Sequence, residues 1–220
     1  LAATTITLDN VEVLGEAIGT GTGGDILFEA TTVSISNDST VNVSSLSTID
    51  EAGDAGAVRI TAETVDIANT EFLLATLGGG EGGALEIDAT DIDLSQTLIE
   101  AETKGSGNGG EILMRGETID WRDVAVNASG IGTGVGGEIL LQGGAIKLLN
   151  PDINITAEGS GAAGDLIASG DSFIATGTGG IFGDSQGSGV GADIQLLTAE
   201  TVLQDVTLTT SSLGDRSEER

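Results

Sequence analysis

A 27-residue repeat runs through most of this chain and limits what it can fold into. The glycine that ends each glycine-rich stretch marks the repeat, and four successive intervals between these anchors are each 27 residues long. The anchors are Gly56, Gly83, Gly110, Gly137 and Gly164. Gly24 precedes them by a longer interval, and Ala192 follows with one extra residue. Self-similarity at a fixed period of about 20–50 residues indicates a solenoid or another repeat array.

Apolar residues within each repeat come in pairs spaced by two, which is the side-chain period of a strand. Counted from the anchor, they fall at offsets +2, +4, +9, +11, +16 and +18; after Gly137 these are Ile139, Leu141, Ile146, Leu148, Ile153 and Ile155. We therefore predict an all-β fold, a right-handed parallel β-helix with about 27 residues and three short strands per coil. An antiparallel sandwich is the alternative, but it does not predict a constant repeat length.

Two further offsets predict corners. Offset +6 holds small residues: Ala30, Ala62, Ala89, Gly116, Gly143 and Gly170. Offset +13 holds polar residues: Asn37, Asn69, Gln96, Asp123, Asn150 and, counted from Ala192, Asp205. Asn tolerates left-handed backbone geometry, so we expect left-handed corners at +13 and a ladder of stacked side-chain amides. The third, glycine-rich corner is predicted to be flexible rather than phosphate-binding, because no Gly-Lys-Ser/Thr follows it.

The repeat predicts one solenoid domain over residues 1–213, with about eight coils. Residues 174–191 weaken the pattern, and we expect a bulge or loop there; residues 214–220 lack it and are predicted to be disordered. The sequence contains no run of 18 apolar residues, so we expect no transmembrane helix. The first residues lack the features of a signal peptide. Since the chain starts and stops in mid-pattern, we expect a processed product or a fragment of something longer.

Composition excludes several kinds of chemistry. The chain has 7 Lys and Arg against 35 Asp and Glu, a formal charge of −28. Such a field repels nucleic acid and anionic membrane and attracts cations, so we expect neither nucleic-acid binding nor membrane insertion. Histidine and cysteine are absent. Ser-His-Asp and Cys-His catalysis, disulfides and zinc-thiolate sites are therefore excluded, and we predict that the chain is not an enzyme.

Two columns of carboxylates are the candidate metal ligands. Offset +10 holds Asp66, Asp93 and Asp120 on three successive coils, and offset +1 holds Glu111, Glu138 and Asp165. Stacking would place like charges roughly 5 Å apart, which is unfavourable unless they are screened, protonated or bridged by a cation. Calcium accepts carboxylate and carbonyl oxygens, so these six residues are candidate calcium ligands and no other cofactor is expected. The competing interpretation, which we favour, is a solvated acidic face that keeps the rod soluble.

Two other functions are open to a β-helix of this composition. A carbohydrate-active β-helix would need arginine and aspartate converging beside one strand face, and Arg115 and Arg122 next to Asp120 are the place to look. An ice-binding face would need a Thr-x-Thr pair on every coil, but the central coils do not supply one.

The Gly-Gly-Asp/Glu-Ile opening resembles the repeats of filamentous-haemagglutinin-type exoproteins of two-partner secretion, and is most similar to the cyanobacterial ones. Gly23–Ile26, Gly109–Ile112 and Gly136–Ile139 carry the likeness, which covers about residues 20–212. The family's secretion domain, with its Asn-Pro-Asn-Leu-like signature, is not matched. The resemblance implies a β-helical stalk, extracellular or on the outer cell surface, with adhesive, biofilm or cell-contact roles and cell-surface or glycan partners. Open coil ends are edge strands, so end-to-end or lateral self-association is also expected.

Overall fold

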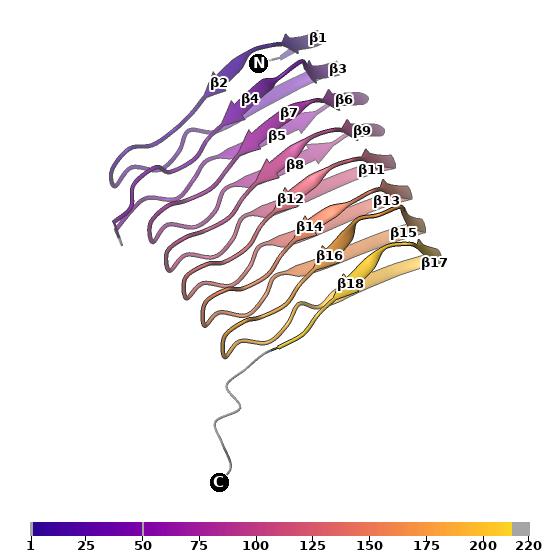
Figure 1. The fold of residues 1–220 in the computed structure, drawn as a ribbon. Helices are drawn as coiled ribbons and strands as arrows, with labels where there is room; N and C mark the ends of the chain where they lie inside the picture. Colours follow the sequence, from indigo (N-terminus) through magenta and orange to yellow (C-terminus); the bar gives the residue numbers. More distant parts are fainter. Residues whose placement is uncertain (1, 50, 213–220) are drawn as a thin grey trace.

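The protein is a stack of parallel β-coils. The computed structural model describes residues 2–49 and 51–212, and these residues form strands and turns without a helix. Figure 1 shows the strands in two layers, with the coils following one another from the N-terminal to the C-terminal end. All strand pairs are parallel, which confirms the solenoid and excludes the antiparallel sandwich. Within the described residues, no helix is long and apolar enough to cross a membrane.

The strands form two sheets. The larger sheet contains β1 (Ala2–Asp9), β3 (Ile26–Ser36), β5 (Ala57–Thr61), β6 (Thr64–Ala68), β8 (Ala84–Asp88), β9 (Asp91–Ser95), β11 (Glu111–Arg122), β13 (Glu138–Leu149), β15 (Asp165–Thr176) and β17 (Ile194–Gln204). The smaller sheet takes one strand from each coil: β2 (Glu12–Leu14), β4 (Ser39–Asn42), β7 (Thr70–Leu73), β10 (Leu98–Glu100), β12 (Ala125–Asn127), β14 (Asp152–Asn154), β16 (Gly180–Phe182) and β18 (Thr207–Thr209).

Neighbouring strands pair residues that are one repeat length, 27 positions, apart in the sequence. Ile112 pairs with Leu85 on one side and Ile139 on the other, so each residue lies beside its counterpart in the next repeat. The side chains at the six apolar offsets are buried throughout the four repeats that begin at Gly56, Gly83, Gly110 and Gly137. A continuous apolar column therefore runs through the stack. Burying one large aliphatic or aromatic side chain contributes about 1.5–3 kcal/mol to stability.

Offset +6 is a bend that does not always interrupt the strand. Three separate strands per coil occur in β5–β7 and β8–β10, whereas β11, β13 and β15 continue through Gly116, Gly143 and Gly170. Met114 and Ile119 are both buried although an odd number of positions separates them. A flat strand would place them on opposite faces, so the chain turns a corner at Gly116 while keeping its hydrogen bonds to neighbouring coils.

The left-handed corners predicted at +13 are confirmed. Positive φ angles of 49–59° occur at all six of those positions. The amide ladder takes a different form, because the amides of Asn37, Asn69 and Asn150 each donate to a carboxylate of the preceding coil rather than to another amide. Asn69 Nδ2 donates to Asp38 Oδ1 at 2.6 Å, and Asn150 Nδ2 donates to Asp123 Oδ1 at 2.8 Å. An anionic acceptor makes a stronger hydrogen bond than a neutral amide, so an aspartate below an asparagine suits this corner.

Insertions explain the irregular repeat lengths. The corner after β3 has two left-handed residues, Asn37 and Asp38, and the corner between Ser45 and Gly56 is longer than its counterparts. The irregularity predicted within 174–191 is one extra residue in the corner between β15 and β16, where Gly177 has a φ of 101°. Residues 214–220, predicted to be disordered, lie outside the described residues.

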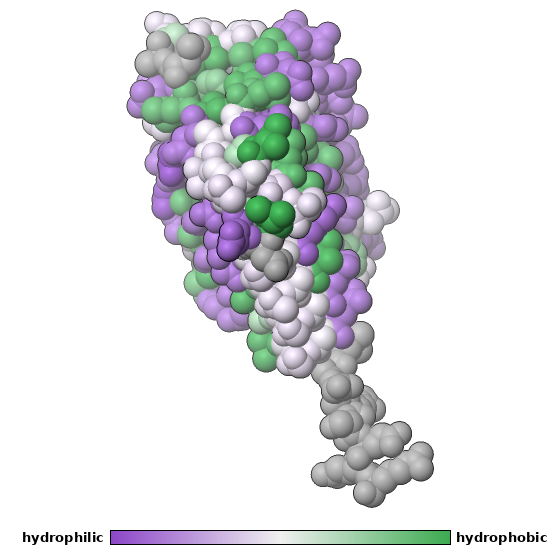
Figure 2. Space-filling view, turned by 90° about the vertical axis from the view of Figure 1, so that its left-hand side faces the viewer, coloured by the Kyte–Doolittle hydropathy of each residue, from purple (hydrophilic) through white to green (hydrophobic). Residues whose placement is uncertain are grey.

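The glycine-rich corners are packed backbone on backbone, which explains their glycines. A Cβ atom on Gly132 would lie 1.6 Å from the carbonyl oxygen of Gly105, and one on Gly159 would lie 1.5 Å from that of Gly132. Figure 2 looks onto this edge, where neutral residues form a band and apolar residues gather towards the first coils. Ile18, 86% exposed, and Ile49, 48% exposed, belong to those first coils.

Candidate functional site

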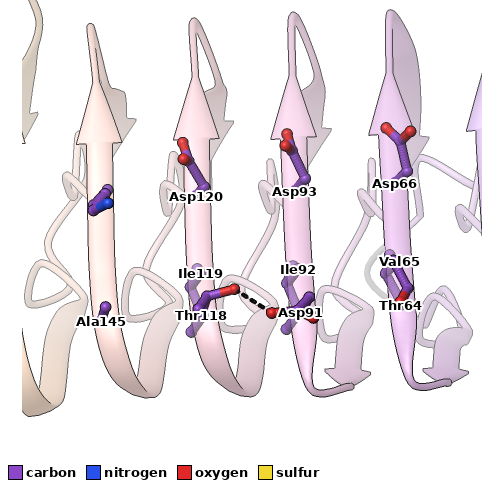
Figure 3. A pocket seen from close by; sticks show the side chains of 11 residues that line it. Thr64, Val65, Asp66, Asp91, Ile92, Asp93, Thr118, Ile119, Asp120 and Ala145 are labelled. Atoms are coloured by element: carbon purple, nitrogen blue, oxygen red, sulfur yellow. Dashed lines mark hydrogen bonds between the residues drawn. The ribbon is translucent and has the colours of Figure 1, made fainter.

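The +10 carboxylates form the expected column on the outer face of three neighbouring strands. Asp66 of β6 pairs in register with Asp93 of β9, which pairs with Asp120 of β11. Figure 3 shows the three carboxylates aligned side by side. Their neighbours at +9 and +11 point into the core, so the alternation of the strand itself turns the aspartates towards solvent.

Arg122 partly neutralises this column. Its guanidinium contacts the Asp93 carboxylate through Nη2, and its Nε lies 3.4 Å from Asp120 Oδ1. Burial raises the pKa of Asp93 most strongly; Arg122 opposes this, and the charges of Asp120 and Asp66 raise it further. The pKa of Asp93 therefore lies above its ordinary value although it contacts a cation. Desolvation, together with repulsion by the neighbouring carboxylates, raises the pKa of Asp93 more than Arg122 lowers it.

A shallow groove of about 400 Å³ surrounds the column. Its polar lining includes a second outward row, in which Thr118 Oγ1 donates to Asp91 Oδ1 at 2.8 Å (Figure 3). Lys147 follows Asp120 directly in the same column, on β13, and also lines the groove. Lys147 was not predicted from the sequence, because only the aspartates at offset +10 were considered as candidate ligands. Carboxylates, threonine hydroxyls and the ammonium group of Lys147 line this groove, and such groups can bind a cation or a hydroxyl-rich ligand.

The +1 carboxylates form a second, separate column. Glu111, Glu138 and Asp165 are paired residues at the starts of β11, β13 and β15, and all three are exposed. Glu111 and Asp120 stand nine positions apart on one strand, at roughly 3.3 Å per residue, so the two columns do not converge. Among the residues that the structure describes, no three carboxylates are grouped closely enough to hold a metal ion.

Arg115 does not share the site of Arg122. Its Nη1 lies 3.0 Å from Glu86 Oε1, and its Nε donates to Gln142 Oε1 at 3.1 Å. Arg59 reaches the same glutamate, with Nε 3.4 Å from Glu86 Oε2. The structure thus divides the two arginines that the sequence grouped, and only Arg122 faces the aspartate column. Pairs this exposed contribute about 0–1 kcal/mol each, so they adjust the surface more than they stabilise the fold.

Fold and surface together define an acidic parallel β-solenoid with a charged groove along the column of Asp66, Asp93 and Asp120. Searches for similar proteins add no name, since no protein-family model, no curated protein and no solved structure matches this chain.

Proposed function

We propose that this chain is a structural or adhesive module of a large exoprotein of the filamentous-haemagglutinin type, secreted or attached to the cell surface. It would act as a rigid stalk or as a surface for cell contact or biofilm. The observation that carries the proposal is the uninterrupted parallel register from β2 to β18 in the smaller sheet. Eight coils at about 4.8 Å give a rod roughly 40 Å long, in which every interior coil is held by hydrogen bonds on both sides.

The surface supports the same role. Side chains bridge neighbouring coils on several faces, as Asn69 does to Asp38 and Arg115 to Glu86. A formal charge of −28 keeps such a rod soluble and discourages contacts with other anionic surfaces. A cell-surface or glycan partner and an extracellular location rest on the resemblance of the repeats.

Adhesion is tested with beads that carry the folded chain, applied to cells and to a panel of glycans. Beads carrying the heat-unfolded chain are the matched control. Binding that requires the folded chain supports an adhesive module. If the folded chain binds no surface, while small-angle X-ray scattering shows a stiff rod of the expected length, the adhesive role is removed and only the role of a stalk is supported.

A carbohydrate-active β-helix is the second candidate, favoured by the groove at Asp93 and Asp120. In that case Arg122→Ala should abolish binding or cleavage of a polysaccharide. Arg115→Ala removes the same charge from an arginine that contacts Glu86 instead of the aspartate column, and it should leave that activity intact. Equal behaviour of the two variants would remove this candidate.

The six proposed calcium ligands are tested by thermal unfolding. Calcium sites predict a melting temperature that rises in millimolar calcium but not in equal magnesium, because the smaller ion demands a stricter geometry. An unchanged melting temperature would leave the carboxylates as a solvated acidic face, which is the interpretation we favour.

A further inference from the structure

The chain contains four Asn-x-Ser/Thr triplets, which is the acceptor pattern for N-linked sugars, and none has proline in the middle position. They begin at Asn37, Asn42, Asn127 and Asn154. The last three asparagines end strands β4, β12 and β14 of the smaller sheet, and Asn127 pairs directly with Asn154. The sequence pattern is the same in all four triplets, so the structure has to distinguish them.

The amide nitrogen that would accept a sugar is already engaged in three of the four triplets. In each of these three it donates to a carboxylate of the preceding coil: Asn37 Nδ2 to Asp9 Oδ1 at 2.7 Å, Asn42 Nδ2 to Glu16 Oε1 at 2.5 Å and Asn127 Nδ2 to Glu102 Oε2 at 3.0 Å. Asn154 Nδ2 has no partner among the described residues. The corresponding place in the coil before Asn154 holds Ser129, which brings no carboxylate there.

The hydroxyl group two residues further on, which the pattern requires, separates the triplets in the same way. The three serines at this place are buried: Ser39 is 0% exposed, Ser44 4% and Ser129 2%. Thr156 is only half-buried, and within the described residues no hydrogen bond engages its hydroxyl. Asn154 and Thr156 therefore leave both the amide nitrogen and the hydroxyl accessible, whereas the other triplets do not.

The main chain holds the Asn154 amide with its nitrogen as the free end. Thr156 N–H donates to Asn154 Oδ1 at 3.1 Å, so the carbonyl end of the amide is bound to the backbone. Phe182 of the next coil pairs with Asn154 and lies over Gly180. Asp152, Gly180 and Phe182 line a shallow groove of about 330 Å³ beside Asn154. Since the face of an aromatic ring is electron-rich, the C–H groups of a first sugar can pack against Phe182.

We propose that Asn154 is the acceptor of an N-linked sugar. The donor is a sugar diphosphate, carried on a nucleotide or on a lipid, and a separate transferase performs the step. A bond forms between Asn154 Nδ2 and the anomeric carbon, and the bond from that carbon to the diphosphate oxygen breaks. The diphosphate leaves with the electron pair, and one amide proton passes to a base of the transferase. The proposal does not depend on whether the rod is a stalk or an adhesin.

Mass spectrometry of the protein isolated from the cells that produce it tests the proposal. Cleavage on the N-terminal side of aspartate places the four triplets on separate peptides, residues 25–37, 38–49, 123–151 and 152–164. We expect a sugar on the 152–164 peptide and unmodified asparagine in the other three. A single monosaccharide indicates a nucleotide donor, and an oligosaccharide transferred as a unit indicates a lipid donor. An unmodified 152–164 peptide, or equal occupancy of all four peptides, would overturn the proposal.

Substitutions of the hydroxyl residue separate a sugar at this triplet from attachment elsewhere on the same peptide. Thr156→Val removes the hydroxyl but keeps the branched shape and the backbone N–H that holds Asn154, so the variant should fold and lose the sugar. Thr156→Ser should keep it. Ser129→Ala, the matched control in the neighbouring triplet, should leave it unchanged. Circular dichroism checks that all three variants retain the β-solenoid. A sugar that persists in Thr156→Val would contradict the assignment to Asn154.

Discussion

Trp121 is the largest fully buried side chain of the core, yet its indole N–H has no hydrogen-bond partner in the described part of the chain. A buried N–H without a partner costs about 1–3 kcal/mol. The residue therefore combines good apolar packing with an unfavourable polar atom. Its place at offset +11 requires a large apolar group but not specifically an indole.

Replacing Trp121 by phenylalanine should change the free energy of unfolding by less than about 1 kcal/mol, because the lost volume and the removed N–H offset each other. Trp121→Ala should cost about 3–5 kcal/mol by leaving a cavity. Denaturant unfolding followed by circular dichroism measures both. A Phe variant as unstable as the Ala variant would show that the indole N–H is not a penalty.

Asp93 predicts a pH effect of definite sign. Its folded-state pKa is raised above the ordinary value of 3.8, so the ionised form is disfavoured by folding. The resulting penalty is full above the folded-state pKa and disappears as the pH falls through that pKa to below 3.8. Asp93→Asn should therefore raise the free energy of unfolding at pH 7, by about 0.5 kcal/mol on the scale of cross-strand charge pairs.

The advantage of Asp93→Asn should vanish in acid, where the parent residue is itself protonated. Thermal unfolding across the pH range follows this difference. Glu63→Gln removes the same charge at an exposed position and is the control for net charge alone. Equal gains from the two variants would mean that neither the burial of Asp93 nor its repulsion by Asp120 and Asp66 destabilises the fold.

The stacked glycine corners are the elements that should tolerate substitution least. In Gly132→Ala the new methyl group meets the carbonyl oxygen of Gly105, and neither backbone can yield without separating two coils. We expect a loss of more than about 2 kcal/mol, as for other backbone-strain mutants. Gly21, around which a Cβ would meet open space, is the matched control.

Gly21→Ala should change the free energy of unfolding by at most about 1 kcal/mol, and in the stabilising direction if the backbone accepts alanine without strain. Thermal unfolding of the two variants side by side gives the comparison. Similar stabilities would mean that the corners are flexible, as predicted from the sequence, and can separate to admit a methyl group.

At the level of elements, the sequence predicted what one coil determines and missed what neighbouring coils determine. The apolar offsets and the left-handed corner of Asn150 follow from residue type, and both were found. Whether the strand continues through Gly116 depends on hydrogen bonds to the adjacent coils. The column of Asp66, Asp93 and Asp120 follows from the repeat. The contact of Arg122 with Asp93 of the preceding coil does not, because it depends on the direction of the arginine side chain.

At the scale of the whole molecule, charge opposes a fold that the core holds together. An excess of 28 negative charges on a narrow stack raises the free energy of the folded state through self-repulsion. The few cross-coil ion pairs, such as Arg59 with Glu86, are exposed and weak, so salt removes more repulsion than attraction.

We therefore expect the melting temperature to rise steadily between low salt and 0.5 M salt, where the screening length falls to about 4 Å. Sodium chloride and potassium chloride should act alike, because screening depends on ionic strength and not on the identity of the ion. A melting temperature that falls with salt would mean that ion pairs, rather than the apolar column, hold the coils together.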